Sequence, residues 1–226
     1  MNKNKFIQAL LKILGGKFST ALGINLKNSG SGGIFKWFLA SILFGARISE
    51  KIAVNTFKEF EKRKVLSPDA ILKTGWEGLV ELLDAGGYVR YDFKTASKLL
   101  EIVKDLKEKY DSSLNKLHQE SKGTGDLEKN LQSLGKGIGE ITTNIFLREL
   151  RDIWKKAEPY PSDLVILACR KSGLIPSGIS SKEKILTELK SIWQENKIKG
   201  KDFADFEAAL LRLGKDYYHK GKTPSF

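Results

Sequence analysis

A chain of 226 residues is long enough to bury a hydrophobic core without disulfide or metal cross-links. Its one cysteine and two histidines provide no ligand set for a disulfide framework, a zinc site or a cysteine-ligated iron–sulfur cluster, so we expect neither a metal nor a cofactor. Lysine and arginine outnumber the acidic residues by 39 to 27, and the net charge of +12 favours a polyanionic partner, either nucleic acid or an anionic membrane surface.

The N-terminal segment predicts an amphipathic helix rather than an export signal. FIQALLKILGG follows two lysines, and no small-residue cleavage site comes after it. Its apolar residues share one helical face; they are Phe6, Ile7, Leu10, Leu11 and Leu14. We therefore expect a packed helix and a cytoplasmic chain.

The next apolar run, IFKWFLASILFGA at 34–46, predicts a buried core helix. It is interrupted by Lys36 and is shorter than the roughly 18 residues that a membrane span requires. We therefore expect no membrane partner for this segment.

Most of the remaining chain has the periodicity of surface helices. Between residues 94 and 110, apolar side chains recur every three, four or seven positions, and lysines and acids occupy the rest. Helix starts are predicted at Ser49, Ser67–Pro68, Asp126 and the capping-box pair Ser180 and Glu183, and helix ends at Gly75, Gly135, Gly173 and Gly214. No run of alternating β-branched residues predicts a sheet. The sequence therefore predicts an all-α fold of about ten helices of ordinary length.

A glycine-rich hairpin separates two such helices in LQSLGKGIGEITTNIFLREL, residues 131–150. Its glycines permit left-handed dihedrals and close backbone approach. The amides at the start of the second helix lack intrahelical acceptors and carry partial positive charge, so the turn predicts a phosphate seat. The alternative is a tight turn between helices with redundant glycines. A nucleotide-binding loop is disfavoured, since no strand precedes the turn and the Walker ending is missing.

This segment resembles the helix-hairpin-helix of the DNA glycosylase superfamily, which includes endonuclease III and the alkyladenine glycosylases. LQSLGKGIGEIT is similar to the family's leucine-spaced helix and Leu-Pro-Gly-Val/Ile-Gly hairpin, and Asp163 in EPYPSDLVILACRKSGLI stands where the family has an essential aspartate. WFLASILFGARISEKIA and DAGGYVRYDFKTASKLLEIV are similar to two further family segments. The four segments keep the family's order across residues 34–175.

The resemblance implies two helical lobes with a cleft between them. Residues 1–46 and 146–226 would form one lobe, and residues 47–145 would form a six-helix lobe ending in the helix-hairpin-helix at 127–150. It also implies a monomeric, nucleoid-associated DNA repair enzyme that binds double-stranded DNA containing a damaged base. The expected phosphate-binding residues are Gly135, Lys136, Gly137, Ile138, Gly139 and Thr142.

The resemblance further assigns the chemistry to Asp163. A carboxylate facing the deoxyribose stabilises the positive charge that develops as the base leaves, and it can orient or deprotonate the attacking water. The alternative is that Asp163 is an ordinary N-cap or first-turn residue, whose negative charge stabilises the start of the helix. Where bifunctional family members carry a Schiff-base lysine, this chain has Ile141, which implies a monofunctional enzyme. The hairpin is one residue longer than the family pattern, so a shifted register that brings Lys136 to the sugar stays open.

Four residues are predicted to contact the flipped base or the distorted duplex. Arg47 occupies the region from which family members insert a side chain into the duplex, while Tyr88, Arg90 and Tyr91 lie in the second family loop. Each has an ordinary alternative, as a core aromatic or as a surface charge.

Two other functions stay open. Helix-hairpin-helix elements also serve as phosphate clamps in DNA-binding proteins that catalyse nothing. The apolar face of residues 3–14 is compatible with a basic protein that binds a membrane surface.

Overall fold

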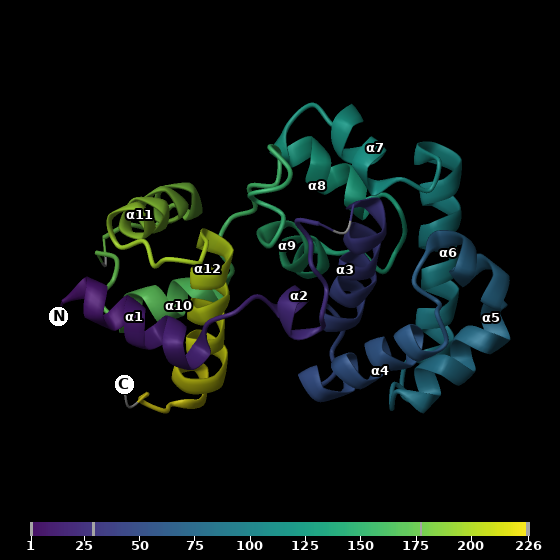
Figure 1. Cartoon of the computed structure of the whole chain (residues 1–226), viewed down its shortest axis with the longest axis horizontal. Helices are drawn as coiled ribbons and strands as arrows, with labels where there is room; N and C mark the ends of the chain where they lie inside the picture. The colour runs from purple at the N-terminus through teal and green to yellow at the C-terminus, as the bar shows by residue number, and fades with distance from the viewer. Residues whose placement is uncertain (1, 29, 177, 225–226) are drawn as a thin grey trace. The chain divides into compact units, whose positions relative to one another are not determined.

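The structure is a computed structural model that describes residues 2–28, 30–176 and 178–224 (Figure 1). These residues form helices and connecting turns without a strand, which confirms the predicted all-α class. The α-helices are α1 (Lys3–Leu14), α2 (Phe18–Ala21), α3 (Gly30–Phe44), α4 (Glu50–Lys62), α5 (Pro68–Ala85), α6 (Asp92–Tyr110), α7 (Leu114–Glu120), α8 (Thr124–Gln132), α9 (Glu140–Arg148), α10 (Asp163–Lys171), α11 (Lys182–Glu195) and α12 (Phe203–Arg212). Over the same ranges, no helix combines the length and apolar character that crossing a membrane requires.

The chain divides into two compact units. Unit 1 comprises Met1–Ala21 and Pro159–Phe226, and unit 2 comprises Leu22–Glu158. These divisions fall at other positions than the lobe boundaries that the resemblance implies at 46/47 and 145/146, because α3 belongs to unit 2. The predicted cleft stays a prediction.

Unit 1 is built around α12, which is buried along nearly its whole length and packs against α1 and α10. The apolar face of α1 is covered, with Ile7 and Leu10 fully buried. Arg212 at the end of α12 donates to the carbonyls of Leu14 (3.0 Å) and Gly16 (2.6 Å). The face that the sequence offers to a membrane surface is therefore used for packing within unit 1.

Unit 2 is built around α3, which is buried at residues 33–35 and 37–43. Trp37 and Phe38 are 0 % and 1 % exposed, and the Trp37 Nε1 donates to the Phe146 carbonyl of α9 over 3.0 Å. Phe38 and Phe146 meet edge to face at 5.1 Å between ring centroids. The prediction of a buried core helix at 34–46 is confirmed.

Local capping signals set several helix boundaries as predicted. The Ser49 Oγ accepts the Ile52 N–H that opens α4, and the Ser67 Oγ caps α5. Asp126 is not a cap, because α8 begins at Thr124 and the Asp126 carboxylate instead accepts the N–H of Lys122. That helix starts earlier than its apolar pattern indicates.

Candidate nucleic-acid interface

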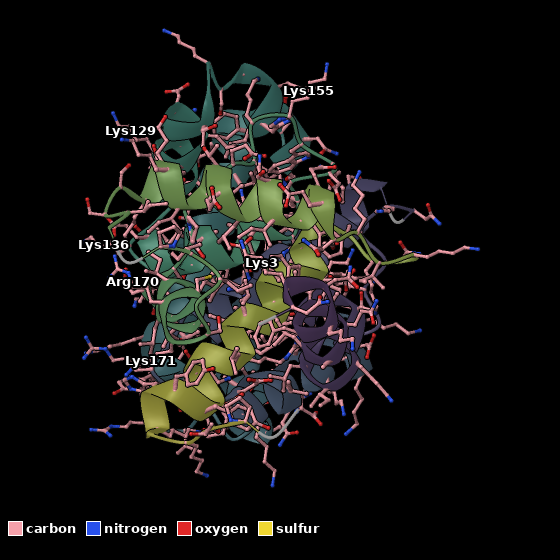
Figure 2. The ribbon with its side chains drawn as sticks, turned by 90° about the vertical axis from the view of Figure 1, so that its left-hand side faces the viewer. Lys3, Lys129, Lys136, Lys155, Arg170 and Lys171 are labelled. Carbon is pink, nitrogen blue, oxygen red and sulfur yellow. The ribbon has the colours of Figure 1, made fainter. Side chains whose placement is uncertain are left out.

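The predicted hairpin is a compact turn at residues 133–139, between α8 and α9. The Ile138 N–H donates to the Gly135 carbonyl over 3.1 Å, which closes the turn. The Ile138 side chain is buried, whereas Lys136 is exposed and projects outward (Figure 2). The turn therefore presents a lysine and backbone to solvent.

The hairpin glycines serve close approach rather than left-handed backbone. None of the three has a positive φ, so the left-handed dihedrals that glycine permits are not used here. A Cβ atom at Gly135 would lie 2.8 Å from Cγ1 of Ile102, and one at Gly137 would lie 3.2 Å from Cδ of Lys98. Both neighbours are on α6, so a larger residue would push the turn away from that helix. Gly139 differs, because a Cβ there would meet no atom within 4 Å.

The start of α9 has backbone donors that precede its hydrogen-bond ladder. Gly139, the N-cap, is extended (φ −98°, ψ −177°) and supplies no side-chain cap. The first bond of the helix runs from the Thr143 N–H to the Gly139 carbonyl over 3.0 Å, so the amides of residues 140–142 lie outside the ladder. Ile141 beside them is 68 % exposed. An uncapped N-terminus of this kind is suited to bind a phosphate.

Charges of both signs surround this helix start. Lys129 and Lys136 project outward (Figure 2), while Glu140 is exposed in the first turn of α9. Burial, and to a lesser extent the negative charge of Glu140, raises the pKa of Glu128. The negative charge of Glu140 interacts favourably with the α9 dipole but repels an incoming phosphate. Lys136 would therefore attract a bound anion, while Glu140 and the half-buried Glu128 would oppose it.

The end of α3 brings Arg47 close to the start of α9. A Cβ atom at Gly45, directly after α3, would overlap the Thr142 hydroxyl. Thr142 is only 3 % exposed there, so it serves packing and offers a phosphate little of its surface. Arg47 follows two residues later and is exposed. The structure thus brings Arg47 and the hairpin to one region of unit 2.

The loop at residues 86–91 is only partly exposed. Tyr88 is 3 % exposed and hydrogen-bonds the Thr95 side chain, and burial raises the pKa of its hydroxyl. This burial favours the alternative of a core aromatic for Tyr88 over a contact with DNA. Arg90 is exposed, and its guanidinium lies 5.6 Å from the ring centroid of the half-buried Tyr91. Arg90 and Tyr91 stay predicted DNA contacts.

Asp163 is the first residue of α10 and belongs to unit 1. The Ser162 side chain caps the helix by accepting the Val165 N–H. The Asp163 side chain is 87 % exposed and pairs with Lys182 at 2.9 Å between Oδ1 and Nζ. The carboxylate is thus accessible to a ligand, in an aqueous rather than an apolar environment.

An exposed aromatic pair in unit 2 was not predicted as functional. Trp76 and Phe93 are 42 % and 59 % exposed, with ring centroids 5.4 Å apart. Their positions follow the helical spacing of buried residues, and Gly75, which interrupts α5 with φ +69°, is the local signal that the pattern breaks there.

The remaining reactive groups are inert or structural. Burial raises the pKa of the Cys169 thiol to about 12, so very little of it is present as the nucleophilic thiolate at neutral pH. His118 stacks on Trp154 with 4.7 Å between ring centroids. Within the part of the chain that the structure describes, no three His, Cys, Asp or Glu side chains cluster closely enough to hold a metal ion.

Comparison with models of known protein families and with curated proteins gives no match to this chain.

Proposed function

We propose that this chain is a DNA glycosylase that binds double-stranded DNA and hydrolyses the N-glycosidic bond of a damaged base. The hairpin is the observation that carries the proposal. A glycine turn packed on α6 leads into the uncapped start of α9, and Arg47 lies beside it. Backbone amides, Lys136 and a net charge of +12 together favour a DNA backbone as the ligand.

Asp163 is the proposed catalytic carboxylate. Departure of the base develops positive charge on the deoxyribose, which a carboxylate stabilises while it orients or deprotonates water. Its present partner is Lys182, and both side chains are more than half exposed. Exposed ion pairs contribute little stability, so the carboxylate can exchange Lys182 for the sugar at small cost.

Extruding the base needs side chains that replace its stacking partners. Arg47 is exposed and follows Gly45, which contacts Thr142 of α9, by two residues; this makes it the leading candidate for insertion into the duplex. Arg90 is a second candidate, because it is also exposed. Pocket shape then decides whether an oxidised, alkylated or deaminated base is accepted.

The reaction is proposed to stop at base release. Ile141 cannot form an imine, so no strand cleavage through a Schiff base is expected at that position. The alternative is a bifunctional enzyme in which Lys136 attacks the sugar; it predicts strand cleavage without alkali and a covalent adduct after borohydride reduction.

A panel of duplexes, each with one lesion, tests the proposal. Wild-type protein should release one class of base, with strand cleavage only after alkali, and Asp163→Asn should abolish release while duplex affinity stays within about threefold. Asp152→Asn, at an exposed aspartate of unit 2, is the matched control and should leave release unchanged. Lys182→Ala shows whether loss of the ion pair alone has an effect.

Each alternative has its own outcome in this experiment. An unchanged release rate in Asp163→Asn rejects Asp163 as catalytic. Duplex binding without release of any base indicates a helix-hairpin-helix module without catalytic activity.

A further inference from the structure

The Trp76–Phe93 pair is an exposed aromatic surface without a role in the proposed reaction. Its ring planes are inclined by 31°, and both side chains stay substantially exposed to solvent. Large aromatic side chains are normally buried, and adjacent exposed ones mark a binding surface.

Hydrogen bonds hold this surface in a defined orientation. The Trp76 Nε1 donates to the Ser97 Oγ over 3.0 Å, and that hydroxyl donates to the Phe93 carbonyl over 2.9 Å. Gly75, with φ +69° and ψ 179°, interrupts α5 directly before Trp76. The indole is thus ordered before any ligand binds, which reduces the entropy lost on binding.

α6 connects this surface to the hairpin. Lys98 on α6 lies against Gly137 of the hairpin, and Phe93 precedes Lys98 by about 7.5 Å along the helix axis at 1.5 Å per residue. The aromatic pair and the residue that contacts the hairpin are thus carried by the same helix.

The charges near the pair favour a polyanion. Within five residues of either ring in sequence, the charged residues are the cations Lys73, Arg90, Lys94 and Lys98 and the acids Glu77, Glu81 and Asp92. Asp92 is buried, so two exposed acids, Glu77 and Glu81, stand against four cations. Aromatic faces flanked by lysines are the usual way in which proteins bind unpaired bases together with their phosphates.

We propose that Trp76 and Phe93 form a stacking site for an unpaired base of a DNA strand whose phosphates contact Lys94 and Lys98. The inference rests on the proposed DNA-binding function and adds a preference for DNA with a single-stranded segment over blunt duplex.

Tryptophan fluorescence reads this site directly. The other three tryptophans, Trp37, Trp154 and Trp193, are 0 %, 3 % and 4 % exposed, so quenching by a DNA ligand reports on Trp76. Oligo(dT) of about eight nucleotides, within the usual site sizes, should quench wild-type emission, and a duplex with such an overhang should quench it more than a blunt duplex. Equal quenching by both duplexes, or quenching by oligo(U) but not oligo(dT), overturns the proposal.

Variants separate stacking from general DNA binding. Trp76→Ala and Phe93→Ala should each weaken overhang binding about fivefold to 150-fold, with blunt-duplex affinity within about twofold. Phe93→Trp should retain overhang binding, and Ile13→Ala, which truncates an exposed apolar residue of unit 1, should change neither affinity. Lys94→Gln should reduce the salt dependence of overhang binding by about 0.7 in log–log slope.

The outcomes distinguish the two proposals. If Trp76→Ala binds overhangs as wild type does and base release persists, the stacking site is refuted and the glycosylase is not. Overhang-specific quenching without release of any base supports the stacking site and refutes the glycosylase.

Discussion

The contact between Gly45 and Thr142 supports the placement of Arg47, and Gly45→Ala tests it. The added methyl group would overlap the Thr142 hydroxyl and lie 3.1 Å from the Ser41 carbonyl oxygen. Overpacking of this kind costs about 1–3 kcal/mol, whereas replacing glycine gains about 0.4–1 kcal/mol through the unfolded chain. We therefore expect the free energy of unfolding to fall by about 1–2 kcal/mol, measured by urea denaturation followed by circular dichroism.

A double-mutant cycle and a matched glycine make this prediction specific. Thr142→Ala removes the overlapping hydroxyl, so Gly45→Ala should cost at least about 0.5 kcal/mol less in the Thr142→Ala background. Gly125→Ala, in α8, places its methyl group where no atom lies within 4 Å, and it should stabilise the protein by about 0.5–1 kcal/mol. Additive single and double variants, or a Gly45→Ala protein as stable as wild type, would refute the close approach of α3 to α9.

Two further predictions concern pH and the hairpin. Burial, and then the positive charge of Lys156, lowers the pKa of His118, so the unfolded chain binds this proton first. The stability that His118 contributes should be complete above the ordinary pKa of about 6.5 and be lost as pH falls through the lowered pKa of the folded protein. The urea midpoint of His118→Phe should therefore fall less than that of wild type between pH 7.5 and 5. The urea midpoint of His219→Gln, which changes an exposed histidine, should fall as much as that of wild type. Gly139→Asp should cap α9 and raise stability by a few tenths of a kcal/mol while weakening duplex binding at least tenfold, because its carboxylate takes the place of a phosphate; unchanged affinity in a filter-binding assay would contradict the phosphate seat.

Features that depend on neighbouring residues along the chain were predictable from sequence. Ser49 and Ser67 cap their helices as predicted, because a cap needs a hydroxyl and an amide only three residues apart. The predicted helix start at Ser180 was wrong by one position, because Ser181 caps α11. Two adjacent serines offer no local basis for choosing between them.

Features that depend on packing between distant segments were not predictable. Gly214 was predicted to end a helix, but the chain continues through it as a π-helix at Leu213–Tyr217. The glycine is needed for packing instead, because a Cβ there would overlap the backbone carbonyl of Leu164 in α10. Gly135 and Gly137 likewise face α6.

The same limit applies to the candidate site. The hairpin was predictable, because its glycines and flanking leucines are contiguous. The burial of Tyr88 and the exposure of Trp76 and Phe93 depend on how α5 and α6 pack, so a helical pattern alone does not distinguish core from surface aromatics.

The buried state of Cys169 makes this chain convenient for site-directed labelling. A thiol with a pKa of about 12 and no exposed surface reacts slowly with maleimides and iodoacetamides at neutral pH. A cysteine introduced at Lys136 or Ile141, both exposed, would then carry nearly all of the label without removal of the native one. A fluorophore or a photocrosslinker at the hairpin could in this way report directly on what approaches the start of α9.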